Sequence, residues 1–420
     1  MSNEPTKTEV ITLGCRLNAF ESEVVRGHAA AAGLTNTYIV NTCAVTAEAE
    51  RQARQTIRRL RRKRPDGTII VSGCAAQINP NAFAAMPEVD WVLGNEEKLR
   101  AESYILNPET GRVFVSDIME TRKITGHLIP GFGSRTRSFI QIQQGCNHRC
   151  TFCIIPFGRG NSRSVPIGFL ANQVRGLVRK DYKEFVLTGV DISSYGSDLP
   201  GRPSLGEMVR RLLDQVPQIE RLRLSSLDPA VTDDPLVSVF ADEPRLMPHI
   251  HLSIQAGNDT ILKRMKRRHS RGNVIELCER LRRARPDLVL GADIIAGFPT
   301  ETDTMFEDTL KLIDVAGLTY LHVFPYSARK GTPAASMPPV PKALCKERAA
   351  ILRKKGDSAK IKFFDQLIGS NANVLSEAKG HGYTEHYAPV IIREEPDAGY
   401  IHQVRITGRM NQTLTAELLP

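Results

Sequence analysis

The sequence lacks any apolar stretch approaching the roughly 20 residues that span a lipid bilayer. Its start, MSNEPTKTEVITL, has no basic segment followed by an apolar run, as a secretory leader would have. Long low-complexity segments are absent too, and a composition of 41% hydrophobic and 24% charged residues is typical of globular domains. We therefore expect a folded cytoplasmic protein that does not associate with membranes.

Cysteine is scarce, with eight residues in a chain of 420, yet six of the eight fall into two sets of three. Because a reducing compartment disfavours disulfides, clustered thiols there are expected to be metal ligands or catalytic groups. One set lies in the stretch QQGCNHRCTFCIIPFGRG, where Cys146, Cys150 and Cys153 form a C-x3-C-x2-C array. The other set is Cys15, Cys43 and Cys74, spaced by 28 and 31 residues.

Neither set has a fourth cysteine, so each set can supply only three thiolate ligands to a metal site. A structural zinc site needs four ligands, and neither set has a histidine at the usual spacing. His148 lies inside the array, where a residue between two ligands usually points away from the metal. A 4Fe-4S cluster held by three thiolates leaves one iron open to a substrate or cofactor. The array therefore favours a reactive cluster, with zinc as the alternative.

The first 120 residues alternate strand and helix patterns. Apolar segments EVITLGC, TYIVNTC and TIIVSGC enclose predicted helices at 18–32 and 47–64, which is a βαβαβ run with a parallel sheet. Cys15, Cys43 and Cys74 each close one strand. Ligands of open α/β sheets bind at the carboxyl ends of the strands, so the three thiols are expected to converge on one site.

Two further regions follow. Six predicted strands alternate with helical stretches, which indicates a doubly wound sheet or a partial barrel short of eight units; they are SFIQIQQ, EFVLTGV, RLRLSSL, HIHLSIQ, LVLGADIIAGF and YLHVFPYS. Beyond a basic helical segment, short strands separated by turn residues indicate a small antiparallel barrel or sheet. Barrels of that size commonly bind nucleic acid on one face.

The C-x3-C-x2-C array, with the aromatic Phe152 directly before its last cysteine, resembles the signature of radical S-adenosylmethionine enzymes. Its pairing with a preceding domain of three strand-end cysteines is similar to the methylthiotransferases of that superfamily. Supporting runs are CIIPFGRGNSRS, HLSIQAGNDTILKRMKR and DIIAGFPTET, in which Thr300 replaces the glycine more usual in the family. The resemblance covers nearly the whole chain.

This resemblance implies an α/β multidomain fold with three domains. Residues 1–120 would form the N-terminal parallel βα domain that holds an auxiliary cluster. Residues 132–362 would form the radical SAM core, a partial (β/α)6 barrel, and residues 363–420 a small antiparallel RNA-binding barrel of the TRAM type.

The resemblance also implies two 4Fe-4S clusters and S-adenosylmethionine as cofactors. The array would hold the cluster that cleaves S-adenosylmethionine to a radical, and the strand-end set would hold the auxiliary cluster, which carries the sulfur to be transferred. An aromatic carbon–hydrogen bond resists ordinary acid–base catalysis, so a cofactor has to supply this chemistry. Residues of these types also commonly end strands in turns, but we expect cofactor contacts from Phe152, Gly189, Ser225, Ser226, Gln255 and Asp293.

The runs TLGCRLNAFESE, LTGVDISSYG and RLSSLDP look most like the branch that modifies threonylcarbamoyladenosine in tRNA, next to the anticodon. The resemblance thus implies transfer of a methylthio group to carbon two of that nucleoside. The alternatives are isopentenyladenosine in tRNA or a ribosomal protein as substrate. An alternative of another class is a non-catalytic iron–sulfur protein that binds RNA.

Lys and Arg outnumber Asp and Glu by 56 to 46, and the resulting net charge of +10 predicts attraction to polyanions. We expect tRNA and an electron donor as partners. Arg159 and Arg163, just past the array, are candidate RNA contacts, with a solvated loop as the plain alternative. Basic runs at 54–64, 263–268 and 353–355 are individually typical of solvated surface. His249 and His251 are expected to be packing or surface residues, Cys278 to lie in the core on the apolar stripe of VIELCERL, and Cys345 to be an incidental thiol.

Overall fold

The computed structural model describes residues 8–420 except 108, 110, 123, 125, 130 and 133–135. The segment MSNEPTK, on which the expectation of no leader partly rests, lies outside the described residues. Contacts within the chain define two compact units. Unit 1 comprises Met1–Ile129, Gln143–Val165 and Ser327–Ala335, and unit 2 comprises Pro130–Ile142, Pro166–Tyr326 and Ser336–Pro420.

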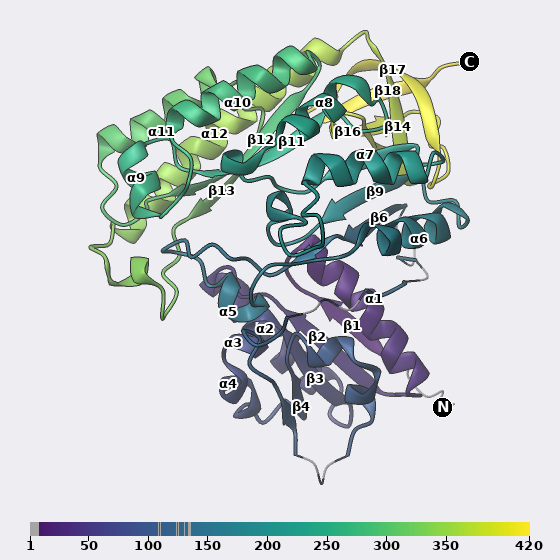
Figure 1. Cartoon of the computed structure of the whole chain (residues 1–420), viewed down its shortest axis with the longest axis vertical. Helices are drawn as coiled ribbons and strands as arrows, with labels where there is room; N and C mark the ends of the chain where they lie inside the picture. Colours follow the sequence, from purple (N-terminus) through teal and green to yellow (C-terminus); the bar gives the residue numbers. More distant parts are fainter. Residues whose placement is uncertain are drawn as a thin grey trace. The chain divides into compact units, whose positions relative to one another are not determined.

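Unit 1 is built on a five-stranded parallel sheet in the order β1-β2-β3-β4-β5 (Figure 1). The strands are β1 Glu9–Thr12, β2 Thr37–Thr42, β3 Thr68–Gly73, β4 Trp91–Leu93 and β5 Val113–Phe114. Strand β2 is buried along its whole length, as expected for a central parallel strand covered on both faces. This sheet confirms the predicted N-terminal parallel βα domain.

Two long helices connect the first three strands, namely α1 Arg16–Ala31 and α2 Ala47–Lys63. The Thr46 hydroxyl caps α2 by accepting from the amide of Ala49 at 3.1 Å. Ala53 and Ile57 are the buried residues of α2, whereas arginines occupy its outer face. Shorter helices follow: α3 Cys74–Ile78, α4 Pro80–Ala84, η1 Glu97–Leu99 and η2 Ala101–Tyr104.

The C-x3-C-x2-C loop also belongs to unit 1. It is closed by an antiparallel pair of two-residue strands, β7 Gln143–Gln144 and β8 Arg163–Ser164, with helix α5 Ile155–Arg159 between them. A separate segment, Ser327–Ala335, reaches this loop through the amide of Ala334, which donates to the carbonyl of Thr151 at 2.9 Å. Unit 1 therefore contains all six clustered cysteines.

Unit 2 contains the six predicted strands of the central domain. Two parallel three-stranded sheets, β10-β9-β6 and β11-β12-β13, are joined by bridges from Leu222 to Leu246 and from Leu227 to Leu252. This arrangement confirms the partial (β/α)6 barrel. Its strands are β6 Arg137–Gln141, β9 Glu184–Thr188, β10 Arg221–Leu224, β11 His249–Gln255, β12 Val289–Ala296 and β13 Tyr320–Pro325. Its helices are α6 Ile167–Val178, α7 Leu205–Gln215, α8 Asp234–Asp242, α9 Asp259–Arg264, α10 Arg271–Ala284 and α11 Asp303–Val315.

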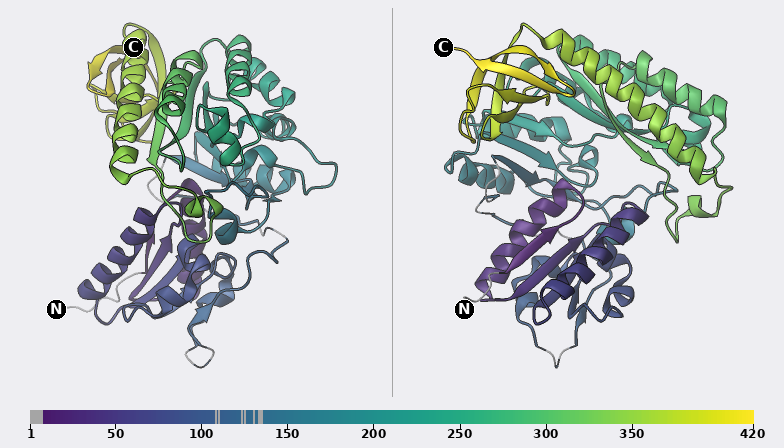
Figure 2. Two further views of the ribbon diagram at one scale, coloured as in Figure 1. Left: turned by 90° about the vertical axis from the view of Figure 1, so that its left-hand side faces the viewer. Right: turned by 180° about the vertical axis from the view of Figure 1, so that it is seen from behind.

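The predicted small barrel is present in unit 2, but it is not wholly antiparallel: the segments 390–392 and 414–416 pair in parallel, while its other strand pairs are antiparallel. Helix α12, Lys342–Leu367, packs along β13, with Gly356 against the side chain of Leu321, and leads into the barrel (Figure 2). The barrel closes in the order β14-β15-β16-β18-β17, and Phe364 of α12 belongs to its core. Its strands are β14 Asn371–Ala378, β15 His381–Thr384, β16 Pro389–Ile392, β17 Ile401–Met410 and β18 Thr413–Leu418.

The barrel packs on the amino ends of strands β6, β9 and β10. Glu184 is the first residue of β9, and its side chain, 1% exposed, lies 2.8 Å from Arg223 Nε. Arg223 donates to the barrel carbonyls of Thr384 and Glu385 at 2.9 and 2.8 Å, and Arg221 donates to that of Asn373 at 2.8 Å. The barrel thus covers the amino ends of these strands and not their carboxyl ends.

The predicted boundaries of three consecutive domains, at residues 120, 132 and 362, stay a prediction. The two compact units are each made of several separate segments and so do not test these boundaries. Among the described helices, none has both the length and the apolar character needed to cross a bilayer.

Candidate active site

The strand-end cysteines stand at neighbouring positions of the unit 1 sheet. Cys43 and Cys74 directly follow β2 and β3, whose last residues, Thr42 and Gly73, are paired. Cys15 comes shortly after β1, at the N-cap position of α1, without a capping hydrogen bond from its side chain. Both Cys15 and Cys74 lie near enough to influence the charge state of Cys43. The sheet therefore gathers three thiols from distant parts of the sequence at one edge, as predicted for parallel strands.

Gly14 allows the turn before Cys15 to approach Cys43. Its φ of +100° lies in the left-handed region that favours glycine. A Cβ added at Gly14 would lie 2.7 Å from Cβ and 2.9 Å from Sγ of Cys43. Any other residue at this position would force the turn away from Cys43.

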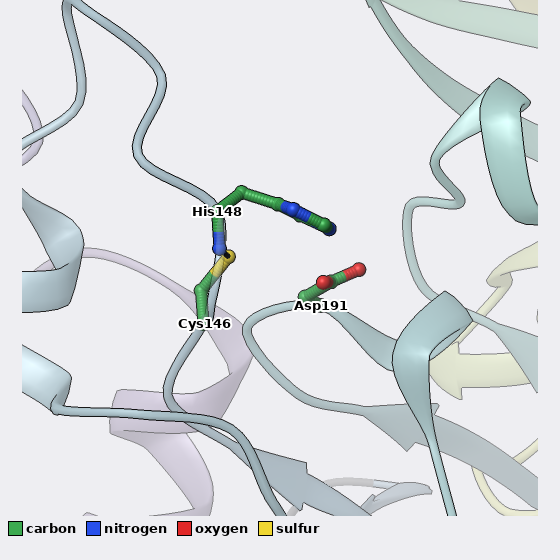
Figure 3. Close-up of side chains that lie close together, drawn as sticks. All are labelled: Cys146, His148 and Asp191. Atoms are coloured by element: carbon green, nitrogen blue, oxygen red, sulfur yellow. Dashed lines mark hydrogen bonds between the residues drawn. The ribbon is translucent and has the colours of Figure 1, made fainter. Parts of the chain in front are cut away.

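Backbone hydrogen bonds hold the C-x3-C-x2-C loop in shape. The amide of Cys146 donates to the carbonyl of Gly160, and that of Cys153 to the carbonyl of Cys150, both at 3.0 Å. The amide of His148 donates to Cys146 Sγ at 3.3 Å (Figure 3). This turn brings a ring nitrogen of His148 within 4.8 Å of that sulfur.

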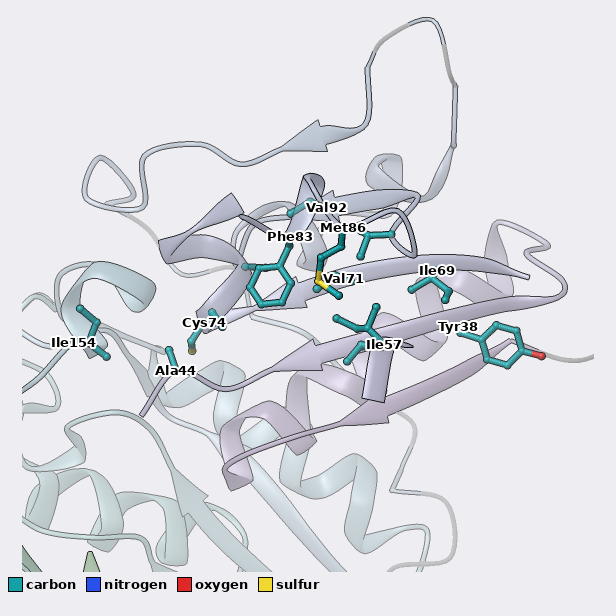
Figure 4. Close-up of a cluster of buried hydrophobic side chains, with 14 residues drawn as sticks. Tyr38, Ala44, Ile57, Ile69, Val71, Cys74, Phe83, Met86, Val92 and Ile154 are labelled. Atoms are coloured by element: carbon teal, nitrogen blue, oxygen red, sulfur yellow. The ribbon is translucent and has the colours of Figure 1, made fainter. Parts of the chain in front are cut away.

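Helix α5 connects the loop to the strand-end cysteines. Ile154 and Cys74 share one cluster of buried apolar side chains (Figure 4). A Cβ added at Gly158 would lie 3.3 Å from Cβ of Cys74, so the helix packs closely on that cysteine. The side chain of Asn95 donates to the carbonyl of Gly158 at 2.5 Å. Both sets of cysteines therefore belong to one packed region of unit 1.

A buried network of charged side chains lies in the same region. Lys98 Nζ lies 2.6 Å from Glu21 Oε2, and Arg159 pairs with the other carboxylate oxygen of Glu21. Burial alone would raise the pKa of Glu21, but the two cations outweigh it and lower that pKa to about 2. Glu21 is thus charged at any physiological pH.

The structure gives both candidate RNA-contact arginines partners inside unit 1. Arg159 has 2% of its side chain exposed and is held by Glu21. Arg163 is buried and donates to the carbonyls of Thr121 and Arg159 at 3.1 and 3.2 Å. Contact with RNA by either guanidinium would require these bonds to open.

The expected cofactor contacts fall in both units. Phe152 lies in the unit 1 loop, partly buried. In unit 2, Gly189, Ser225 and Ser226 follow the carboxyl ends of β9 and β10, whereas Gln255 ends β11 with a φ of +75°. A non-glycine residue in this left-handed conformation is uncommon and is found more often at functional sites. Cofactor binding by these residues stays a prediction.

Asp293 of β12 is the sixth expected contact, and it lies between two histidines. Its Oδ1 is 3.0 Å from Nε2 of His251 and 3.4 Å from Nδ1 of His322. Burial alone would raise the pKa of Asp293, but hydrogen bonds from the histidines hold it well below the usual range. The sequence-based reading of His251 as a packing or surface residue missed this bond. The reading of His249 as a packing residue agrees with its stacking on Tyr387, at 5.3 Å between ring centroids.

The donor sets fit iron–sulfur clusters. None of the eight cysteines forms a disulfide, and Cys278 and Cys345, which are buried, belong to unit 2, whereas both sets belong to unit 1. Burial raises the pKa of Cys43 to about 11, so that a metal has to displace the thiol proton before Cys43 can act as a ligand. Three thiols around a sheet edge, with Arg159 as a nearby positive charge, suit a cluster that carries negative charge.

Gly14→Ala is expected to weaken iron binding by the strand-end set about 10- to 100-fold, the range for loss of a supporting contact at a metal site. The matched control is Gly33→Ala, which has a similar positive φ of +67° but nothing within 4 Å of the added Cβ. Iron is measured after anaerobic reconstitution of protein in which the three array cysteines are alanine. Equal losses in both variants would show that backbone strain, and not the approach to Cys43, is responsible.

Two family models match the chain. Residues 140–313 match the Radical SAM superfamily, and residues 7–94 match the Uncharacterized protein family UPF0004. Among solved structures, the chain is similar to the radical S-adenosylmethionine methyltransferase TsrM from Kitasatospora setae, with a TM-score of 0.56 and 13% identity. That match covers 79% of this chain and 75% of the other, and it supports the fold alone.

Curated relatives match along nearly the whole chain. The threonylcarbamoyladenosine tRNA methylthiotransferase MtaB of Rickettsia prowazekii is 51% identical, over 96% of this chain and 95% of its own. The MtaB of Thermotoga maritima is 36% identical, over 94% and 93% of the two chains. A tRNA-2-methylthio-N(6)-dimethylallyladenosine synthase of Cereibacter sphaeroides is 34% identical, over 99% of both.

Identity to the Rickettsia relative clearly exceeds identity to the dimethylallyladenosine enzyme, although both matches cover more than nine-tenths of this chain. The family uses S-adenosylmethionine and 4Fe-4S clusters. The chain belongs to the radical S-adenosylmethionine methylthiotransferases, in the branch of the threonylcarbamoyladenosine tRNA methylthiotransferases.

Proposed function

We propose that this protein adds a methylthio group to carbon two of threonylcarbamoyladenosine in tRNA, next to the anticodon. The observation that carries the proposal is the 51% identity over nearly the whole chain to an enzyme named for this reaction. It is supported by two sets of three cysteines in one packed region of unit 1, none of them in a disulfide, since three thiolates can hold a cluster with an open iron. A ribosomal-protein substrate and a purely structural cluster have no such support.

Each set of cysteines has a separate role in this proposal. Cys146, Cys150 and Cys153 hold the cluster that binds S-adenosylmethionine, while Cys15, Cys43 and Cys74 hold the auxiliary cluster. When bound, these groups supply the radical and the sulfur that the protein itself lacks. The chain's own residues fix the ligands: the loop bonds set the array, the sheet edge sets the other three thiols, and α5 packs between them. An external electron donor completes the system.

We further propose that tRNA binds along helix α2. A groove there is lined by Gln52, Gln55, Arg58, Arg59 and Arg62, together with Leu13 and Thr56. The groove adjoins the strand-end cysteines, since Leu13 lies two residues before Cys15. In the described part of the chain, neither Arg59 nor Arg62 forms an ion pair, whereas Arg51, Arg54 and Arg61 on the same helix do. Unpaired arginines beside glutamines suit contacts with phosphates.

The double variant Arg59→Ala and Arg62→Ala is expected to bind tRNA more weakly, with a shallower salt dependence. Loss of two phosphate contacts lowers the slope of log affinity against log salt by about 1.4 to 1.8. Filter binding or fluorescence anisotropy over a salt series measures both quantities. Arg51→Ala removes a charge from the same helix outside the groove and serves as control. A double variant that behaves like this control would refute the groove as the interface.

Mass spectrometry of tRNA nucleosides tests the proposed reaction directly. Cells that lack this gene are expected to lose 2-methylthio-threonylcarbamoyladenosine and keep the unmodified nucleoside. The wild-type gene and a Cys278→Ala version should restore the product, because Cys278 is buried in α10 of unit 2 and belongs to neither cysteine set. Loss of a methylthio-isopentenyladenosine instead would assign the chain to the other tRNA substrate.

A further inference from the structure

Arg159 joins the array loop to a strand-end cysteine through one side chain. It is the last residue of α5, and its Nε donates to Sγ of Cys74 at 3.0 Å. Nη1 donates to Glu21 and, at 3.3 Å, to Gln144, whereas Nη2 donates to Asn18. All three nitrogens of this guanidinium therefore have a partner, and one of the partners is a ligand sulfur.

The buried charges around Cys74 do not cancel. Glu21 faces two cations, Lys98 and Arg159, and none of the three side chains is more than 2% exposed. Counted over these three side chains, two cations against one carboxylate leave one positive charge in excess; burial lowers the pKa of Lys98, whereas the pKa of Arg159, which contacts Cys74, is raised despite burial by the negative charges near it. Water and salt screen a buried charge only weakly, so this excess acts strongly on whatever Cys74 binds.

Stability alone is a weak explanation for this arrangement. Burying two cations and a carboxylate costs desolvation energy, and a buried ion pair is therefore weak evidence of a gain in stability. A pairing between Glu21 and Lys98 would already neutralise the carboxylate. The third charged group adds a cation in excess and aims its Nε at a sulfur, which a purely structural pair does not require.

We propose that Arg159 is a positioning residue that raises the reduction potential of the auxiliary cluster. The inference rests on the proposed function, in which Cys15, Cys43 and Cys74 hold that cluster. Reduction adds one electron, hence one negative charge, to the cluster. A hydrogen bond to a ligand sulfur and a nearby positive charge both favour the reduced state. Arg159 supplies both, and it does so from the loop that carries the other set of ligands.

The test is a redox titration followed by electron paramagnetic resonance, on the full chain prepared anaerobically. Cys146, Cys150 and Cys153 are replaced by alanine so that only the auxiliary cluster is observed; the pairing of β7 with β8 and the bond from residue 146 to Gly160 use backbone atoms and remain. Arg159→Gln is expected to shift the potential to a more negative value. Arg159→Lys, which keeps the charge, should shift it less.

Glu21→Gln provides the opposite change, because it removes the negative charge and leaves Arg159 in place. We expect its potential to shift to a more positive value. The control is Arg149→Gln, which removes an exposed arginine of the same loop that donates to Cys146, His148 and Asn161 and not to Cys74. Its potential should equal that of the parent protein. Opposite shifts for Glu21→Gln and Arg159→Gln cannot arise from mere loosening of the fold.

Iron content and circular dichroism establish that each variant is folded and loaded. If Arg159→Gln fails to hold iron, Arg159→Lys and Glu21→Gln still test the inference. The reduction potential must shift to a more negative value in Arg159→Lys and to a more positive value in Glu21→Gln. Potentials that are unchanged, or that move in the same direction in both, would overturn the inference while leaving the proposed function intact. Absence of any cluster in the parent protein would contradict the proposed function itself.

Discussion

Cys150→Ala protein is expected to form no 5′-deoxyadenosine above background, a loss of more than about 100-fold. Loss of an outer contact that supports a metal ligand already lowers metal affinity or activity about 10- to 100-fold. Replacing the ligand itself is expected to lower the activity further. Cys43→Ala protein is expected to keep part of this activity and to lose the methylthiolated product, because Cys43 belongs to the other set, at the edge of the unit 1 sheet. Chromatography of reaction products with reductant, S-adenosylmethionine and tRNA measures both outcomes.

Cys278→Ala is the matched control for these variants. Its thiol is fully buried in α10, and it should retain both 5′-deoxyadenosine formation and product formation. Identical defects in Cys150→Ala and Cys43→Ala would refute separate roles for the two sets. Because α5 packs directly on Cys74, circular dichroism is needed to exclude a structural defect that spreads from one set to the other.

Glu184→Gln is expected to lower the free energy of unfolding of unit 2 by about 3 to 5 kcal/mol, the cost of removing one partner from a buried ion pair. Glu184 is the carboxylate that Arg137, Arg221 and Arg223 share, at 3.8, 3.8 and 2.8 Å. Although burial disfavours its charge, these arginines keep the pKa of Glu184 below the usual value. Without that charge, the buried guanidinium groups of Arg221 and Arg223 would lose their carboxylate partner where the small barrel packs, whereas Arg137 would keep its ion pair with Glu377.

The variant should therefore loosen the barrel first. Limited proteolysis is expected to cut near residues 368–370, between α12 and β14, earlier than in the wild-type protein. Glu347→Gln changes an exposed carboxyl on α12 of the same unit and serves as control. Unfolding curves and cleavage rates equal to those of this control would show that the shared carboxylate does not hold the barrel.

The charge of the small barrel bears on whether the barrel binds RNA. Residues 371–420 carry four basic side chains against six acidic ones; the basic residues are Lys379, Arg393, Arg405 and Arg409, and the acidic residues are Glu377, Glu385, Glu394, Glu395, Asp397 and Glu417. The barrel covers the amino ends of β6, β9 and β10 with arginine-to-carbonyl bonds. RNA binding by the barrel stays a prediction, and it cannot rest on an excess of positive charge.

The sequence was enough to predict the elements that present the cysteines. Each of the three N-terminal strands is a short apolar run bounded by polar residues, and a cysteine follows each run by at most three positions. Local periodicity reports such strands well, and parallel pairing then brings their ends together. The six strands of the central domain were found in the same way, although the choice between a sheet and a partial barrel came from family resemblance.

The partners of the buried charges could not be predicted. Arg159 and Glu21 are 138 residues apart, and Glu184 meets Arg223 across two strands. The spacing of such residues in the sequence does not indicate that they form a pair. Because charged side chains are usually exposed to solvent, the sequence also gives no reason to expect them to be buried. Arg159 was read as an RNA contact because it follows the array and is basic. Only the packing of α5 shows that its side chain turns inward.

Thr300 illustrates a departure from the family pattern that the backbone makes visible. Its φ of +69° lies where glycine is favoured, so threonine there costs roughly 1–2 kcal/mol. A hydrogen bond that glycine could not accept helps to offset this cost, since Arg264 donates to the Thr300 hydroxyl at 2.7 Å. The glycine expected from the family and the threonine found thus serve the same turn.

The central claim is that two separate clusters form on two sets of three cysteines. Iron and sulfide analysis with Mössbauer spectroscopy after anaerobic reconstitution tests it most directly. We expect roughly eight iron atoms per chain, and about four when either Cys15, Cys43 and Cys74 or Cys146, Cys150 and Cys153 are replaced by alanine. About four iron atoms in the unaltered protein, or zinc in their place, would contradict the account.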